Sequence, residues 1–213
     1  LVVELFYQVL NAEVDMEEWV RLRASDQVPG TGVLKDLTPG LKLRLMDAAA
    51  LAIIVSDNTA ANLVLNRVGL NRVNQRMAAL GLADIYLGTP FMFDHPERNV
   101  GSPLSFMHLL LGLADHELLN PEFCELLLGM MHRQQYVDYI PRYLPYHAFG
   151  DEFGAPSELQ IANKVGMLAG TTNDMAVVTH PAKKYAVVIF SRDCRDRYSG
   201  PDHEGPKLIA EAS

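Results

Sequence analysis

Two short polar segments, well separated in the chain, carry side chains that could take part in acyl transfer. The first is Ser56-Asp57-Asn58 and the second is Lys164-Val165-Gly166. A hydroxyl can relay a proton to a departing nitrogen, and an ammonium stabilises negative charge on a substrate. Each segment also has a simpler interpretation. Ser, Asp and Asn are the preferred N-cap residues of helices, and a lysine on a strand edge can be merely solvated.

The apolar pattern predicts which elements position these segments. From residue 1 to about 145 the apolar residues recur at helical spacing, including the stretch from Leu41 to Ile54. Three short runs, 159–165, 175–179 and 185–190, are predicted to be strands, and β-branched residues support this in the last two. The turn at 180–184 predicts an antiparallel hairpin from these two runs. Residues 206–212 are predicted to begin a closing helix. The chain therefore divides into a mainly helical part and a sheet part.

Ser56 is predicted to lie at a junction between two helices. The apolar run 51–55 ends at Ser56, and a new helix starts near Thr59 with apolar residues on one face. A helix-turn-helix formed by 58–68 and 70–80 is an alternative. The acidic balance of the chain opposes DNA binding by such a motif.

Composition excludes several classes of function. The 213 residues are 49% hydrophobic, enough for a core, and their net charge of −8 opposes nucleic acids and anionic membrane surfaces. No apolar run reaches the roughly 18 residues of a membrane span. Two cysteines without a C-x-x-C and seven histidines without an H-x-x-x-H or H-E-x-x-H indicate neither a metal nor a disulfide framework. No strand–G-x-G-x-x-G–helix pattern occurs, so we expect no cofactor.

Several ordered motifs resemble class A β-lactamases, which belong to the penicillin-recognising enzyme superfamily. They are the P-G-T-G-V-L turn at 29–34, the L-T-P-G-L turn at 37–41, the stretch 43–65 with its S-D-N-T-A-A-N-L segment, the Lys164-x-Gly166 motif, and the N-D-M-A-V-V strand at 173–178. The resemblance implies an α+β fold of the DD-peptidase/β-lactamase type, with a helical lobe and helices packed on an antiparallel sheet whose N-terminal strands are missing. It implies one catalytic domain over 1–213, mainly helical over 1–148, with the sheet lobe over 149–213.

The same resemblance gives the candidate residues their roles. Ser56 would relay the proton to the leaving nitrogen, and Lys164 would supply positive potential near the Ser56 hydroxyl and attract the substrate carboxylate. Asn58 would hydrogen-bond a substrate amide, while Val165 and Gly166 complete the substrate-binding strand. The N–H of Met167 would be one donor of the oxyanion hole.

The sequence departs from the resembled pattern at the substrate strand and at the deacylation loop. Val165 stands where Thr or Ser would hold the substrate carboxylate, through a hydrogen bond worth about 1.5–3 kcal/mol. No E-x-x-L-N loop lies between Leu87 and Pro103, and Phe91 stands near the place of its Glu. Asp94 and Glu97 are not assigned that role. The segment 136–145, Y-V-D-Y-I-P-R-Y-L-P, resembles β-lactamase-like serine hydrolases that also lack this Glu.

The nucleophile of the resembled family is absent, because no serine in the chain has a lysine three positions later. Leu1 begins inside a predicted helix without a capping residue, and the resemblance places the S-x-x-K motif a few residues before Leu1. We therefore expect a fragment that is incomplete at its N-terminus and is itself inactive.

The predicted function is that of a serine acyl hydrolase of the class A β-lactamase type, which cleaves a β-lactam amide or a related acyl substrate through an acyl-serine intermediate. The alternative is a penicillin-binding or sensor-like module that acylates or binds without turnover. The expected partner is a small-molecule substrate, and we expect a monomer. The resemblance implies a secreted or periplasmic protein.

Overall fold

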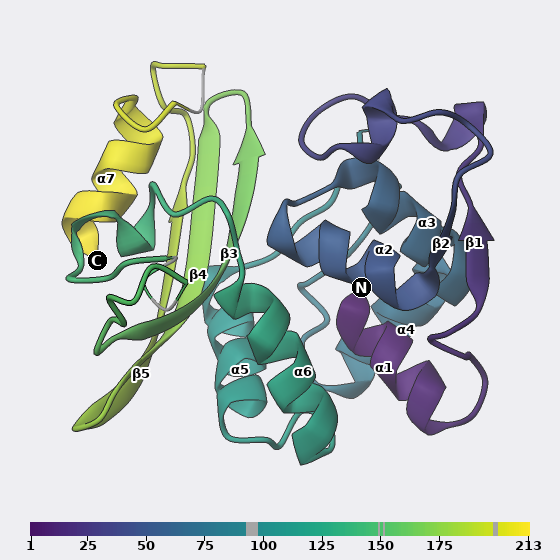
Figure 1. Ribbon diagram of the computed structural model, residues 1–213, viewed down its shortest axis with the longest axis horizontal. Coiled ribbons are helices and arrows are strands. Elements are labelled where there is room, and N and C mark those ends of the chain that lie inside the picture. The colour runs from purple at the N-terminus through teal and green to yellow at the C-terminus, as the bar shows by residue number, and fades with distance from the viewer. Residues whose placement is uncertain (93–97, 149, 151, 198–199) are drawn as a thin grey trace. The chain divides into compact units, whose positions relative to one another are not determined.

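The computed structural model describes residues 1–213 except 93–97, 149, 151, 198 and 199 (Figure 1). Two compact units make up the chain. The first comprises Leu1–Ser105 and Leu119–Phe123, and the second comprises Phe106–Leu118 and Cys124–Ser213.

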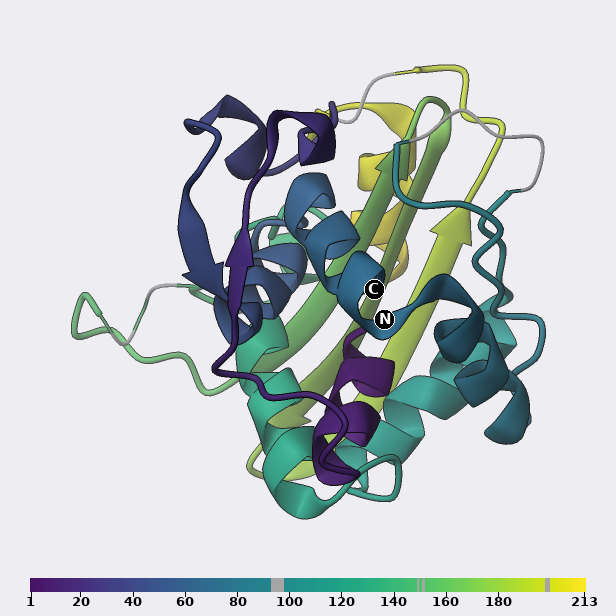
Figure 2. The same cartoon turned by 90° about the vertical axis from the view of Figure 1, so that its right-hand side faces the viewer.

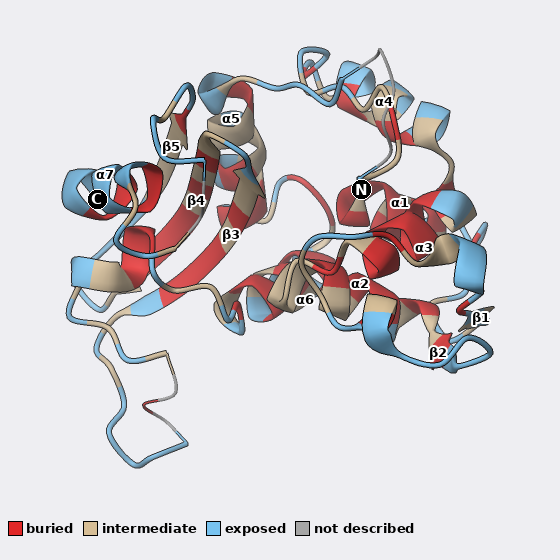
Figure 3. Cartoon of the chain, turned by 90° about the horizontal axis from the view of Figure 1, so that it is seen from above, coloured by how far each residue is buried: buried red, intermediate tan, exposed pale blue. Residues whose placement is uncertain are grey.

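The first unit is mainly helical. Its elements are α1 (Val2–Leu10), β1 (Trp19–Arg21), the 3-10 turns η1 (Ala24–Asp26) and η2 (Leu34–Asp36), β2 (Lys42–Arg44), α2 (Leu45–Ile54), α3 (Asn58–Val68) and α4 (Leu70–Ala79). The short strands β1 and β2 pair antiparallel, with Trp19 opposite Arg44. Helix α3 packs against α1, α2 and α4 and is buried on nearly all sides, so it forms the centre of this unit (Figure 3).

A buried carboxylate ties α1 to α4. Glu4 is only 1% exposed, and its two oxygens lie 3.4 Å from Arg72 Nε and 2.9 Å from Arg76 Nε. Gln8, one turn later on α1, donates to Glu4 at 2.7 Å and to the carbonyl of Val68 at 2.9 Å. A buried charge needs such partners to offset its lost hydration. This network fixes the helices that support α3.

The second unit is built on a three-stranded antiparallel sheet in the order β3-β4-β5 (Figures 1 and 2). Its elements are most of α5 (Pro103–Ala114) and α6 (Pro121–His132), η3 (Ile140–Tyr143), β3 (Gln160–Leu168), β4 (Thr171–His180), β5 (Lys183–Ser191) and α7 (Glu204–Ala212). Gly170, with a φ of 73°, makes the turn between β3 and β4, because L side chains rarely adopt that conformation. Pro181 and Ala182 make the turn between β4 and β5.

The two faces of this sheet bury different sets of side chains. On one face, Ile161 and Val165 of β3 pack with their β4 neighbours against α7 and η3. That core consists of Tyr139, Ile140, Ile161, Val165, Ala176, Val178 and Ile209. On the other face, Phe190 makes an edge-to-face contact with Phe106 of α5 at 5.5 Å, and Ala162 faces α6. Side chains alternate between the two faces of a strand. Successive residues of β3 therefore pack against different elements.

The α+β fold class predicted from the sequence is confirmed. The three predicted strands and the closing helix all form, and the helix junction lies between Ile54 and Asn58 as expected. The helical interpretation was wrong at the start of the stretch from Leu41, because 42–44 form β2 and pair with β1. Within the described part of the chain, no helix has the length and apolar character needed to cross a membrane.

Candidate active site

The Ser56 loop is held by the side chain of Asp57, which is 1% exposed. Its Oδ1 accepts the N–H of Ala60 at 2.8 Å and so caps α3. Its Oδ2 accepts the N–H groups of Val33 and Leu34 at 2.7 and 2.8 Å. The capping interpretation is therefore correct for Asp57. The same carboxylate also joins the loop to the turn at 29–34.

Two glycines allow the turn at 29–34 to lie directly against the Ser56 loop. A Cβ on Gly32 would lie 2.2 Å from Asp57 Cγ, and a Cβ on Gly30 would lie 2.4 Å from Asn58 Nδ2. Both glycines also have φ near +100°, at 102° and 97°, where L residues are strained. The P-G-T-G sequence is therefore a steric requirement of this loop, which explains why the two motifs occur together.

Ser56 itself adopts a left-handed backbone conformation, with φ of 51°. This conformation costs a non-glycine residue about 1–2 kcal/mol. The carbonyl of Ser56 accepts a hydrogen bond from the Thr31 hydroxyl, and its side chain is half-buried. Asn58 donates its N–H to Thr31 O at 3.2 Å and its Nδ2 to Pro29 O at 3.3 Å. Strained residues of this kind cluster at functional sites.

Phe91 is anchored to α3, the helix that begins at Asn58. The buried Asn62 side chain donates to the Phe91 carbonyl at 2.9 Å and accepts the Phe91 N–H at 2.9 Å. The next residue, Met92, would lie 3.5 Å from a Cβ on Gly30. The apolar segment Phe91-Met92 therefore lies beside the Gly30 turn. Asp94 and Glu97, the carboxylates left without a role, lie outside the described residues.

Lys164 lies on β3, an edge strand of the three-stranded sheet, and is half-buried. Its Nζ donates to the carbonyl of Val165 at 2.6 Å. Burial lowers the pKa of Lys164 to about 8, and the negative charge of Asp174 opposes this shift. Lys164 therefore loses its proton at a lower pH than a solvated lysine does.

The other predicted residues of β3 occupy both faces of the sheet. Val165 is 4% exposed and its side chain packs in the core beneath α7, and the Met167 sulfur accepts a hydrogen bond from the Tyr139 hydroxyl at 2.6 Å. Any contact of Val165 or Met167 with a substrate would therefore use the backbone. Gly166, opposite Asn173, adds no side chain to the other face.

Asp174 and Asn163 are buried polar residues of this sheet that sequence reasoning did not single out as functional. The Asp174 carboxylate, 1% exposed, accepts the N–H of Ile140 at 3.1 Å and the Asn163 amide at 3.3 Å. Burial raises the pKa of Asp174 to about 7, although these hydrogen bonds and Lys164 lower it. The available signal was a carboxylate directly before the apolar residues of the predicted strand 175–179.

The predicted site residues form two groups. Ser56 and Asn58 belong to the first unit, and Lys164, Val165, Gly166 and Met167 belong to the second. Each group is ordered by its own contacts, and the pairing of one with the other stays a prediction. Among the described residues, no cluster of three or more His, Cys, Asp or Glu side chains is placed to hold a metal ion.

A helical unit with a Ser-Asp-Asn loop and an antiparallel sheet with Lys-x-Gly on its edge strand define a β-lactamase-like serine hydrolase. The model of the beta-lactamase enzyme family matches residues 1–213, and the chain belongs to that family. No curated protein matches the chain.

Solved structures of the same class are similar over nearly the whole chain. A beta-lactamase from Sphaerobacter thermophilus DSM 20745 is 30% identical with a TM-score of 0.87, over 98% of this chain and 75% of that one. A mutant of PBP-A, solved as an acyl-enzyme complex with penicillin G, is 26% identical with a TM-score of 0.82, over 99% and 74%. A beta-lactamase from Chitinophaga pinensis DSM 2588, at 21% identity and a TM-score of 0.79 over 99% and 81%, supports the fold alone.

Proposed function

We propose that this chain carries the proton-relay and substrate-binding residues of a serine acyl hydrolase that acts on a β-lactam or a related acyl substrate. The observation that carries the proposal is the Ser56 loop, held in a strained conformation by Asp57 and by two glycines. A plain helix cap needs neither the positive φ of Ser56 nor the close packing of a second turn. Because the chain belongs to the beta-lactamase family, we interpret these features as part of an acyl-transfer site.

The reaction requires a nucleophile that these 213 residues do not contain, since no Ser-x-x-Lys occurs in them. The oxygen of that serine bonds to the substrate carbonyl carbon as its hydroxyl proton passes to a base, and this proton is the one that Ser56 later relays. As the tetrahedral intermediate collapses, the carbon–nitrogen bond breaks and Ser56 passes a proton to the departing nitrogen. Lys164 attracts the substrate carboxylate, Asn58 binds a substrate amide, and the N–H of Met167 stabilises the oxyanion. Water then hydrolyses the acyl-serine.

We further propose that this last step is slow. Deacylation needs a base that holds a water molecule against the acyl-serine. The sequence has no E-x-x-L-N, and the apolar segment Phe91-Met92 lies beside the Gly30 turn, near the Ser56 loop. Apolar side chains exclude water rather than activate it. The acyl-enzyme should therefore accumulate.

Intact-mass spectrometry of the full gene product after mixing with penicillin G tests the proposal. We expect a shift by the whole mass of the drug that persists for many minutes, while the chain from Leu1 to Ser213 alone gives no shift. A prompt return to the unmodified mass with accumulating penicilloate would show that a base exists, and would contradict slow deacylation. An adduct with an ester probe but none with penicillin would assign the site a non-lactam acyl substrate.

The second candidate is a penicillin-binding or sensor-like module that is acylated without turnover. It is favoured by the same Phe91-Met92 segment and by the penicillin acyl-enzyme captured in the related PBP-A mutant. Measurement of released product separates the candidates. Penicilloate exceeding one equivalent of protein supports a hydrolase, whereas a yield that stops at one equivalent supports the binding module.

A further inference from the structure

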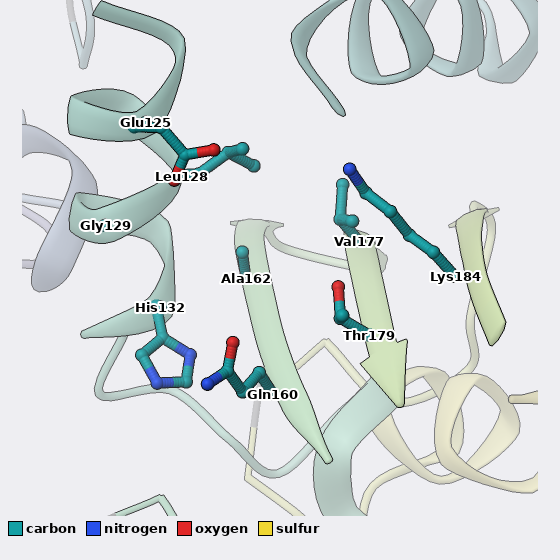
Figure 4. Close-up of a pocket in the computed structure, with 9 residues that line it drawn as sticks. All are labelled: Glu125, Leu128, Gly129, His132, Gln160, Ala162, Val177, Thr179 and Lys184. Atoms are coloured by element: carbon teal, nitrogen blue, oxygen red, sulfur yellow. The ribbon is translucent and has the colours of Figure 1, made fainter. Parts of the chain in front are cut away.

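A cavity of about 300 Å³ lies in the second unit, between α6 and the ends of β3, β4 and β5 (Figure 4). Its floor is formed by Ala162 and Val177, and Leu128 of α6 lines one side. None of the residues assigned above to acyl transfer lines it. The cavity therefore has no role in the proposed reaction.

A glycine inside helix α6 keeps this cavity open. Gly129 lies within Pro121–His132, where glycine weakens a helix relative to alanine. A Cβ at this position would meet no atom within 4 Å, so no neighbouring group requires the glycine. Its backbone also lies outside the positive-φ region in which glycine is needed. Because Gly129 lines the cavity and has no side chain, it leaves free space on the cavity wall.

Lys184 lines the cavity and brings its positively charged ammonium group to it (Figure 4). Its Nζ donates to the carbonyl of Ala114, and it forms no ion pair with any carboxylate in the part of the chain that the structure describes. In a protein of net charge −8, an ammonium without a carboxylate partner is available to an anion. Glu125, at the rim, is instead engaged by His116 at 2.6 Å.

Further polar groups surround the same space. Gln160 and Thr179 lie opposite each other in the β3–β4 register, and both side chains line the cavity without a hydrogen bond to any described residue. His132 uses Nδ1 to contact the Ile161 carbonyl at 3.1 Å, and its ring lies next to Gln160 in Figure 4. An amide, a hydroxyl and an ammonium around an apolar floor can bind a carboxylate group attached to a compact apolar body.

From this arrangement we propose that the cavity binds a small organic carboxylate. The carboxylate is held by Lys184 with Thr179 and Gln160, and the apolar body lies against Ala162, Val177 and Leu128. The space left at Gly129 admits that body. Because Lys184 is exposed, its attraction is screened by salt, and the affinity should fall as the salt concentration rises.

Benzoate is a suitable probe, with neutral benzamide as its isostere of the same shape. Amide chemical shifts of the ¹⁵N-labelled full gene product would be followed during titration with each compound. We expect benzoate to shift the amides of Gly129, Ala162 and Thr179 at millimolar concentrations, and benzamide to bind at least fivefold more weakly. Equal shifts with both compounds, or no shift at these residues up to tens of millimolar benzoate, would overturn the proposal.

Substitutions separate the cavity from a general surface effect. Lys184→Met keeps the length of the side chain and removes its charge, so it should weaken benzoate binding at least fivefold. The adjacent Lys183→Met is the matched control and should leave binding unchanged, because Lys183 lies over the Tyr185 ring and does not line the cavity.

Gly129→Leu fills the space and should abolish the benzoate shifts, while Gly129→Ala raises the melting temperature and confirms that the helix tolerates a side chain there. Binding that survives both Lys184→Met and Gly129→Leu would place the carboxylate elsewhere and refute the site.

Discussion

The Ser56 loop and strand β3 hold their predicted site residues by opposite means. In the loop, one buried carboxylate accepts three backbone N–H groups, and two glycines make the close packing possible. In β3, nine register pairs with β4 fix the backbone, and no single side chain is responsible. The loop thus depends on particular side chains for its geometry. In β3 the side chains matter mainly for electrostatics, through Lys164 and the buried Asp174 of the paired strand β4.

The Ser56 loop and the sheet should therefore respond differently to substitution. A substitution at Asp57 should disturb the shape of the loop, whereas a substitution at Asp174 of β4 should leave β3 and β4 paired and change how stability depends on pH.

Asp57→Ala should lower the free energy of unfolding by about 3 kcal/mol or more, because it leaves three N–H groups of the buried loop without an acceptor. Chemical denaturation of the two proteins measures this. Asp36→Ala is the control, since the Asp36 side chain is 75% exposed in its pair with Lys35. The control should change stability by less than about 1 kcal/mol. Similar losses for both variants would mean that Asp57 is no more than a surface cap.

Asp174→Asn should remove a pH dependence of stability between about pH 4 and pH 7. Burial raises the pKa of Asp174 from 3.8 in the unfolded chain to about 7 in the folded one. The folded state therefore holds this proton more tightly, so the stability that Asp174 contributes is full below pH 3.8 and is lost as the pH rises to 7. We expect the variant to exceed the original protein in stability at pH 8 by more than about 1 kcal/mol.

The neighbours of Asp174 titrate in other ranges. The pKa of Lys164 is lowered to about 8 in the folded protein, so its titration increases the free energy of unfolding as the pH rises from 8 to 10.5. The pKa of Tyr139 is raised to about 12. Asp202→Asn is the control, because Arg142 lowers the pKa of Asp202 and its contribution is lost below the usual carboxyl range. An unchanged slope between pH 4 and 7 in Asp174→Asn would assign that slope to another group.

Lys164→Ala in the full gene product should lower kcat/KM at least about tenfold, or about 1.4 kcal/mol, since in the proposed reaction the ammonium stabilises charge on the bound substrate. Steady-state hydrolysis of nitrocefin or an ester measures this effect. Lys183→Ala should retain the original rate, because Lys183 lies at the start of β5. Equal rates for the two variants would remove Lys164 from the site.

Ser56→Gly should be more stable than Ser56→Ala by about 1 kcal/mol, because glycine accepts the positive φ at this position without strain. Both variants lack the hydroxyl, so both should acylate slowly in the full gene product. Thermal unfolding and the rate of adduct formation give the two readouts. If the glycine variant were no more stable than the alanine one, the backbone of Ser56 would be unstrained.

Much of the fold could be predicted from local patterns. Strands β3, β4 and β5 were predicted from three short runs, with β-branched residues in the last two and a tight turn between them, and the closing helix α7 was predicted at 206–212. The hairpin of β1 and β2 was missed because three-residue strands carry no usable periodicity and their partners are far apart in sequence. A short segment such as 42–44 becomes a strand only when its partner is in place.

The candidate residues could be selected from the sequence, and their roles stay predictions, whereas the contacts around them could not be predicted. The Ser56 junction, the P-G-T-G turn and the Lys-x-Gly strand were each recognised. The joining of Asp57 to the turn and the anchoring of Phe91 by Asn62 were not, because both depend on contacts between distant segments. Likewise the alternation along β3 assigned Val165 to the core once the position of α7 was known.

The class of this protein could be predicted from the sequence alone, because motif order and residue type are local properties that folding does not change. The same properties selected the candidate residues, whose roles stay predictions. Only the tertiary structure decided how these residues behave. Burial depends on what packs from elsewhere in the chain, and burial moves the pKa of Lys164 down to about 8 and that of Asp174 up to about 7. Distant backbone contacts likewise hold Ser56 in a conformation that its own sequence disfavours.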